Sequence, residues 1–102
     1  MRIRLLSLAE DDLLAGFKFY ERQATGVGSY FLESLNSDID SLLLYAGIHR
    51  VVHGYHRLLS KRFPFSVYYD IQGEEIRVWR VLDSRRDPTW IRVQLGKLRS
   101  NQ

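Results

Sequence analysis

Basic side chains in the second half of this 102-residue chain are the ones best suited to chemistry. Residues 50–102 contain eleven Lys and Arg against five Asp and Glu, a net charge of +6. Residues 1–49 contain four against seven, a net charge of −3. Nine of the eleven basic residues are arginines, whose planar guanidinium groups form paired hydrogen bonds with phosphate or carboxylate oxygens. We therefore expect an anionic partner to bind to the second half of the chain.

Seven side chains in this half form the candidate set for binding a target or a nucleic acid: Arg57, Lys61, Arg62, Arg80, Arg85, Arg86 and Trp90. Residues 57–62 lie on or just after one predicted strand, and residues 80–86 lie on or just after another. An antiparallel sheet would bring several of these guanidinium groups to one face or edge, where neighbouring aromatic rings can stack on bases. The alternative is a solvated basic surface with the aromatic rings packing the sheet. Because one half of the chain carries all the excess positive charge, we favour a binding surface.

Other reactive side chains match no known pattern. The three histidines of residues 49–56 have no Cys or carboxylate between them, and Gly54 interrupts the helical spacing of known zinc motifs. Ser60 and Ser66 have His and Asp nearby, but no G-x-S-x-G nucleophile elbow is present. The glycines at 26 and 28 are too few for a phosphate-binding loop. The sequence therefore predicts neither a metal nor a cofactor.

The first half of the chain reads as a strand followed by two helices. Residues 3–6 favour a short strand, and Ser7 with Glu10 has the form of a capping box that begins a helix. Apolar residues then recur at helical spacing to Ala24, where residues 26–28 form a turn. A second apolar stripe runs from Phe31 to Leu43 and predicts a helix that stops near residues 46–47. Together the two segments predict an antiparallel helix hairpin.

The second half alternates with a period of two. Segments 55–61, 65–71 and 75–82 predict an antiparallel meander, and Asp87 followed by Pro88 predicts the start of a short closing helix or a packed tail. The fold class is α+β, an antiparallel β-sheet packed on an N-terminal antiparallel helix hairpin, in the order β-α-α-β-β-β-(α). We expect residues 1–102 to form a single domain, since 45% hydrophobic residues suffice for one core.

Composition removes several classes of protein. The chain has no cysteine, which excludes disulfide scaffolds, thiolate zinc sites and cysteine nucleophiles. No apolar run approaches the roughly 18 residues that a membrane span needs, and residues 1–6 do not resemble a signal peptide. We therefore expect a cytoplasmic protein with no membrane partner.

An ordered set of short segments resembles the RelE/ParE superfamily, the toxins of type II toxin-antitoxin systems of bacteria. The segments are residues 9–13, 19–21, Gly28 with 31–32, 57–58, 61–65, 67–69, 81–82 and 85–88. The resemblance implies a sheet facing a helix hairpin. It also implies an acidic, partly disordered antitoxin that wraps the toxin, and contact with operator DNA only through the toxin-antitoxin complex.

Two activities occur in that superfamily. RelE-like members cleave mRNA on the ribosome, with basic residues that activate the 2′-hydroxyl and stabilise the phosphorane, and ParE-like members bind DNA gyrase. Metal-free cleavage also needs an acid for the leaving oxygen. The candidate catalytic side chains are Lys61, Arg62, Arg80, Arg85 and Arg86, with Lys61 as the base only if its pKa falls.

The acid is the missing member of this set. Trp90 stands where an mRNA-cleaving relative has a tyrosine, and Asp83 stands where ParE-like chains often have a histidine. We therefore expect a ParE-like toxin of the plasmid-stabilisation type that inhibits growth by binding DNA gyrase. The alternatives are a ribosome-dependent mRNA endonuclease and an antitoxin-binding module that has lost its toxicity.

Overall fold

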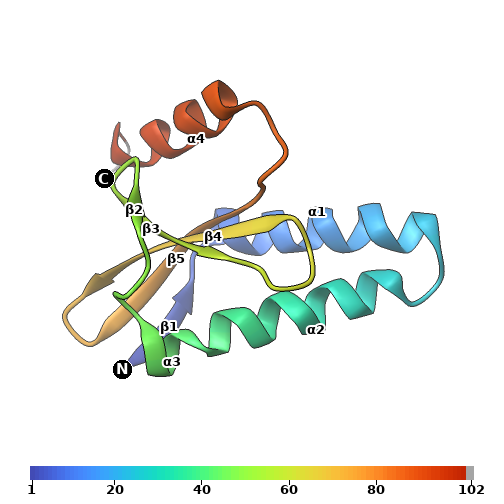
Figure 1. The fold of residues 1–102 in the computed structure, drawn as a ribbon, viewed down its shortest axis with the longest axis horizontal. Helices are drawn as coiled ribbons and strands as arrows, with labels where there is room; N and C mark the ends of the chain where they lie inside the picture. The colour runs from blue at the N-terminus through green and yellow to red at the C-terminus, as the bar shows by residue number, and fades with distance from the viewer. Residues whose placement is uncertain (101–102) are drawn as a thin grey trace.

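A five-stranded sheet organises the chain in a computed structural model that describes residues 1–100 (Figure 1). The strands are β1 (Arg2–Leu5), β2 (Val51–Val52), β3 (Tyr55–Leu59), β4 (Phe65–Gln72) and β5 (Glu75–Asp83). Their order across the sheet is β1-β5-β4-β3-β2, and all neighbours are antiparallel except β1 and β5, which are parallel. The predicted meander is confirmed. The two-residue strand β2 and the parallel position of β1 were not predicted.

The helix hairpin is also confirmed, and a carboxylate holds its turn together. Helix α1 spans Ser7–Gln23 and α2 spans Val27–Asp40. The carboxylate of Glu21 accepts hydrogen bonds from the backbone N–H groups of Gly26, at 3.0 Å, and Gly28, at 2.9 Å. An anion at this position satisfies backbone donors at the beginning of α2 and interacts favourably with its dipole. Gly26 has a φ of 92°, which only glycine adopts without strain.

Two local predictions for the helices are wrong. Leu6 donates its N–H to Val78 O in the sheet, so the helix starts immediately at Ser7 and no side chain caps it. The second helix does not continue to residue 46, because it is interrupted at Ser41 and resumes as the short helix α3 (Leu42–Tyr45). Leu43, expected on the buried stripe, is exposed to solvent.

The sheet has a hydrophobic core on each face. On the face covered by α1 and α2, Val67 and Tyr69 of β4 pack with Phe31 and other apolar side chains of the hairpin. On the other face, helix α4 (Pro88–Ser100) packs Leu95 and its neighbours against Tyr68. Helix α4 lies apart from the hairpin in Figure 1. The predicted closing segment is therefore a helix, and it covers the face of the sheet that the hairpin leaves open.

Helix α4 begins where the sequence predicted. Pro88 is its first residue, and the side chain of Asp87 accepts a hydrogen bond from the Thr89 N–H at 2.8 Å. Proline loses nothing in the first turn, because its missing N–H would have had no partner within the helix. Among residues 1–100, none of the helices combines the length and apolar composition that crossing a membrane requires.

Candidate functional site

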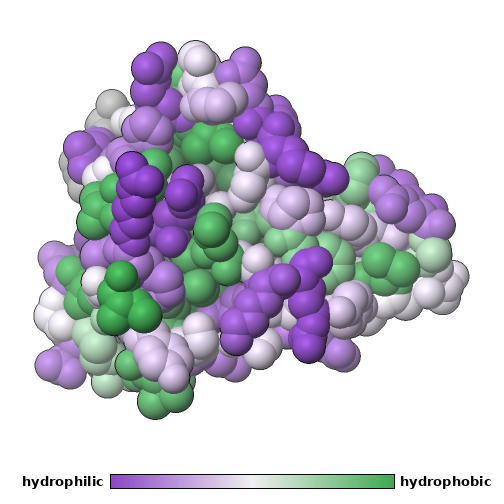
Figure 2. Space-filling model, in the orientation of Figure 1, coloured by the Kyte–Doolittle hydropathy of each residue, from purple (hydrophilic) through white to green (hydrophobic). Residues whose placement is uncertain are grey.

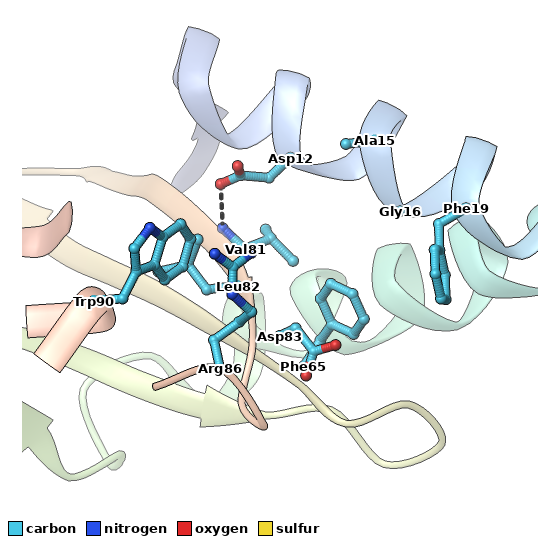
Figure 3. Close-up of a pocket in the computed structure, with 10 residues that line it drawn as sticks. All are labelled: Asp12, Ala15, Gly16, Phe19, Phe65, Val81, Leu82, Asp83, Arg86 and Trp90. Atoms are coloured by element: carbon cyan, nitrogen blue, oxygen red, sulfur yellow. Dashed lines mark hydrogen bonds between the residues drawn. The ribbon is translucent and has the colours of Figure 1, made fainter. Parts of the chain in front are cut away.

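A groove of about 340 Å³ opens between α1, the neighbouring ends of β4 and β5, and the beginning of α4 (Figure 3). Its lining residues are Asp12, Ala15, Gly16, Phe19, Phe65, Val81, Leu82, Asp83, Arg86 and Trp90. Phe19 is 48% exposed although it is a large apolar residue on α1. Gly16 of α1 packs directly against the ring of Phe31, where an added Cβ would clash. The groove therefore offers aromatic surface that solvent can reach.

An ion pair fixes one wall of the groove. The guanidinium of Arg80 donates to both carboxylate oxygens of Asp12, at 2.7 and 2.9 Å, and to Gln94 Oε1 at 3.2 Å. Asp12 also accepts the backbone N–H of Val81 at 2.9 Å, the bond drawn in Figure 3. The Arg80 and Asp12 side chains are only 11% and 15% exposed. Arg80 therefore joins α1, β5 and α4, and its charge is already neutralised by Asp12.

The turn after β5 carries two further arginines, Arg85 and Arg86, which contact different groups. Asp83 accepts hydrogen bonds from the backbone and side chain of Arg85, and this hydrogen bonding holds the pKa of Asp83 below its usual value. The guanidinium of Arg86 lies over the indole ring of Trp90, 3.8 Å from its centroid. This cation–π contact positions an exposed positive charge at the mouth of the groove. Arg86 and Trp90 are thus the two members of the candidate set that line the groove.

Lys61 and Arg62 lie elsewhere. They follow β3 in the connection to β4 and line a separate hollow with Ser34, Ser37 and Asp38 of α2. In Figure 2, hydrophilic side chains cross the surface between the sheet and the lower helix, which is α2 in Figure 1. The backbone of this connection contacts the turn after β5, where the Ser84 N–H donates to Pro64 O at 2.8 Å, but Lys61 and Arg62 line a different hollow from Arg86.

Arg57 belongs to neither group. It lies on β3 opposite Tyr68 of β4, and it lines a third pocket with Ser66, Ser84 and residues of the α4 face. Its Nε atom is buried, and no hydrogen-bond acceptor for it is found among residues 1–100. Five of the seven candidate side chains thus line three different hollows, and the other two, Arg80 and Arg85, are paired with carboxylates.

The histidines form a structural cluster. The Nδ1 atom of His49 is hydrogen-bonded to the hydroxyl of Tyr69, which also accepts the N–H of Gly47 at 2.9 Å. The ring of His56 stacks on Tyr69, and its Nδ1 donates to the His49 carbonyl at 2.8 Å. Burial, and to a smaller extent the neighbouring His56, lower the pKa of His49. In the part of the chain that the structure describes, no three metal-ligating side chains come together.

Comparison with solved structures finds a similar fold. A chain of the structure described as the chromosomal ParDE TA system from P. aeruginosa superimposes with a TM-score of 0.69 and 23% sequence identity. The similarity covers 79% of this chain and 92% of that chain. The fold is ParE-like. No family model matches the chain, and comparison with curated proteins gives no match. The resemblance seen in the sequence is thus confirmed at the level of the fold.

Sequence reasoning missed the helix side of the groove in this ParE-like fold. Phe19 lies off the apolar stripe through Leu13 and Phe17, and an aromatic residue outside such a stripe is the signal that could have pointed to it. Asp12 lies in the segment 9–13 of the family resemblance, which gives it no role of its own. Nothing in its local sequence indicates that it pairs with Arg80, since the partners are 68 residues apart.

Proposed function

We propose that this chain is the toxin of a type II toxin-antitoxin system and acts by binding DNA gyrase rather than by cutting RNA. The ParE-like fold supports the toxin assignment. The distribution of the candidate catalytic side chains supports binding, because Arg80 and Arg85 are held by carboxylates and Lys61 lines a different hollow. A base, cations and an acid therefore do not surround one phosphate position, as metal-free cleavage requires.

The groove is the surface that we assign to the antitoxin in this proposal. Its exposed Phe19 and the ring of Trp90 offer anchors for apolar side chains, and Arg86 offers a charge for an acidic one. A disordered acidic peptide gains most by ordering over such a surface. We also propose that residues 1–102 form one domain and that the protein is cytoplasmic. In this proposal the chain contacts operator DNA only through the toxin-antitoxin complex.

The first experiment is expression. We expect the chain to arrest bacterial growth when it is induced alone, and growth to recover when the short acidic protein encoded next to it is co-expressed. Normal growth on induction alone would instead favour an antitoxin-binding module without toxicity.

The second experiment separates the targets. Purified toxin should inhibit supercoiling of relaxed plasmid by gyrase, and antitoxin should reverse the inhibition. Arg86→Ala should weaken this reversal by the antitoxin, whereas Arg92→Ala, which removes the same charge outside the groove, should not. If the toxin leaves gyrase active but cuts mRNA in a reconstituted translation extract, and Lys61→Ala or Arg85→Ala abolishes the cuts, the RelE-like alternative replaces this proposal.

A further inference from the structure

We infer that the hollow beside α2 binds an acidic α-amino acid, whose carboxylates contact Lys61 and Arg62 and whose ammonium group contacts Asp38. The hollow lies between α2 and the connection from β3 to β4, and its remaining lining residues are Ser34 and Ser37. It shares no lining residue with the groove beside α1, which we assign to the antitoxin. The inference goes beyond the toxin assignment and does not depend on it.

The first argument is that charges of both signs line this hollow without neutralising each other. Lys61 and Arg62 are exposed, whereas Asp38 is only 6% exposed. Within residues 1–100, none of the three forms an ion pair, although all of them border the same space. The Asp38 carboxylate accepts a hydrogen bond from the Ser60 hydroxyl at 2.7 Å, but this donor is neutral. Because a nearly buried carboxylate is costly without a cationic partner, a ligand that brings a positive group to Asp38 stabilises the folded protein.

The second argument is a buried hydroxyl without a partner at the same hollow. Ser34 is 4% exposed, and its Oγ atom is buried with no hydrogen-bond partner in the part of the chain that the structure describes. It lies four residues before Asp38 on α2, so the two side chains share one face of the helix. An unpaired buried hydroxyl has a cost in free energy that a hydrogen bond to a ligand removes. The Ser34 and Ser37 hydroxyls can donate and accept, so they suit either charged group of the ligand.

The third argument concerns the class of ligand. A simple anion would be attracted by Lys61 and Arg62 but repelled by Asp38, and a simple cation would meet the opposite conflict. A ligand with charges of both signs avoids this conflict. Because two basic side chains face one acidic side chain, the ligand that neutralises the hollow carries two negative groups and one positive group, as aspartate and glutamate do.

The size of the hollow agrees with such a ligand. Its volume of about 320 Å³ exceeds what a single ion needs and falls within the range of roughly 300–1,000 Å³ for small-molecule sites. An amino acid therefore fits with both its backbone groups and its side chain inside the hollow.

The test uses the purified full-length chain and nuclear magnetic resonance at constant pH and ionic strength. L-Glutamate or L-aspartate should shift the amide resonances of Ser34 and Ser37 in a saturable way. Glutarate has both carboxylates of glutamate without the ammonium group, and L-glutamine lacks the second carboxylate, so each should bind about tenfold or more weakly than L-glutamate. Binding of glutarate, L-glutamine or inorganic phosphate as tight as that of both acidic amino acids would overturn the proposal. The absence of saturable shifts with both acidic amino acids would also overturn it.

Variants then connect the binding to the hollow. Asp38→Asn keeps the shape and the acceptor for Ser60 but removes the charge, so it should weaken binding by about tenfold to a hundredfold and abolish the preference over glutarate. Asp40→Asn makes the same change at an exposed position of α2 and should bind as the wild type does. Arg62→Gln should weaken binding by about tenfold, and Arg92→Gln, at an exposed position of α4, is its control.

Ser34→Ala separates binding from stability. It removes a buried hydroxyl that has no partner, so the free protein should be at least as stable as the wild type in urea denaturation, while L-glutamate binds severalfold more weakly. Arg62→Gln and Ser34→Ala serve if Asp38→Asn does not fold. Undiminished binding by the folded variants of the hollow would refute the site.

Discussion

At the scale of single residues, the role of each arginine depends on the group it faces. Arg80 faces a carboxylate in a nearly buried position, Arg85 faces one at the surface, and Arg86 lies on an indole ring. An arginine whose charge is satisfied inside the protein is a structural residue, and only an unsatisfied one is free for a partner. Three arginines that lie within seven residues of each other in the sequence, Arg80, Arg85 and Arg86, therefore differ in role.

The Arg80–Asp12 pair yields a stability prediction. Arg80→Met leaves the carboxylate of Asp12 nearly buried without its partner, so we expect the free energy of unfolding to fall by about 3 kcal/mol. Urea denaturation measures this change. Arg85→Met is the control and should change stability little, because that pair is open to solvent and screened. Equal losses in the two variants would mean that burial does not distinguish the pairs.

The His49 cluster predicts a dependence of stability on pH. Because burial and His56 lower the pKa of His49 below 6.5, the unfolded chain binds a proton at this residue more readily than the folded protein does. Stability should therefore be full above that pH and decrease as the pH falls below it. His49→Gln should flatten the decrease in urea denaturation across this range. His53→Asn, at an exposed turn position with φ of 53°, should keep the wild-type slope.

At the scale of elements, the hairpin depends on how closely two helices approach. The residues that allow this are Gly16, which faces the ring of Phe31, and Gly28, which faces Phe17. Helix propensity alone would favour alanine at both positions, so tertiary contact has overridden it. Periodicity located the two helices correctly, but it did not reveal how closely they pack.

Glycine substitutions test this packing. In Gly28→Ala the added Cβ would lie 2.7 Å from the Phe17 carbonyl oxygen, and we expect a loss of about 1–3 kcal/mol in the free energy of unfolding. Gly96→Ala in α4 meets no atom within 4 Å and should gain about 0.5–1 kcal/mol from helix propensity. Thermal and urea denaturation measure both. A gain in both variants would show that α1 and α2 are not in close contact at Gly28.

At the scale of the molecule, folding redistributes the charge that the sequence places in two halves. One ion pair joins an acidic residue of the first half to a basic residue of the second, Asp12 with Arg80. Two further arginines, Arg77 and Arg85, pair with carboxylates of their own half. Within the described residues, Arg57, Lys61, Arg62 and Arg86 form no ion pair. The positive surplus available to a partner is therefore smaller than the sequence count and is distributed over several surfaces.

Antitoxin binding should reflect both apolar anchors and this exposed charge. If the proposed partner covers the groove, its dissociation constant should rise with ionic strength, since salt screens contacts with Arg86. Phe19→Ala should weaken binding by about tenfold at every salt concentration, as expected for a central aromatic anchor. Leu14→Ala removes an exposed apolar residue of α1 outside the groove and should have little effect. Titration calorimetry measures these constants, and a salt-independent one would remove Arg86 from the interface.

The sequence by itself determined what depends on neighbours along the chain. Periodicity located both long helices, the meander of β3, β4 and β5, and the start of α4 at Pro88. These features follow from local spacing, capping chemistry and turn residues, which a single sequence displays. The ordered segments also indicated the ParE-like fold, which the structural comparison confirms.

Only the tertiary structure decided which side chains meet. It paired Arg80 with Asp12, placed Lys61 in a hollow beside α2, and left Arg57 without a carboxylate partner among the described residues. These outcomes depend on strand order, on the parallel insertion of β1 beside β5, and on the placement of α4 over the second face. Contacts between residues far apart in the chain leave no periodic signal. For that reason the sequence located the charge, and the fold determined which part of it can bind a partner.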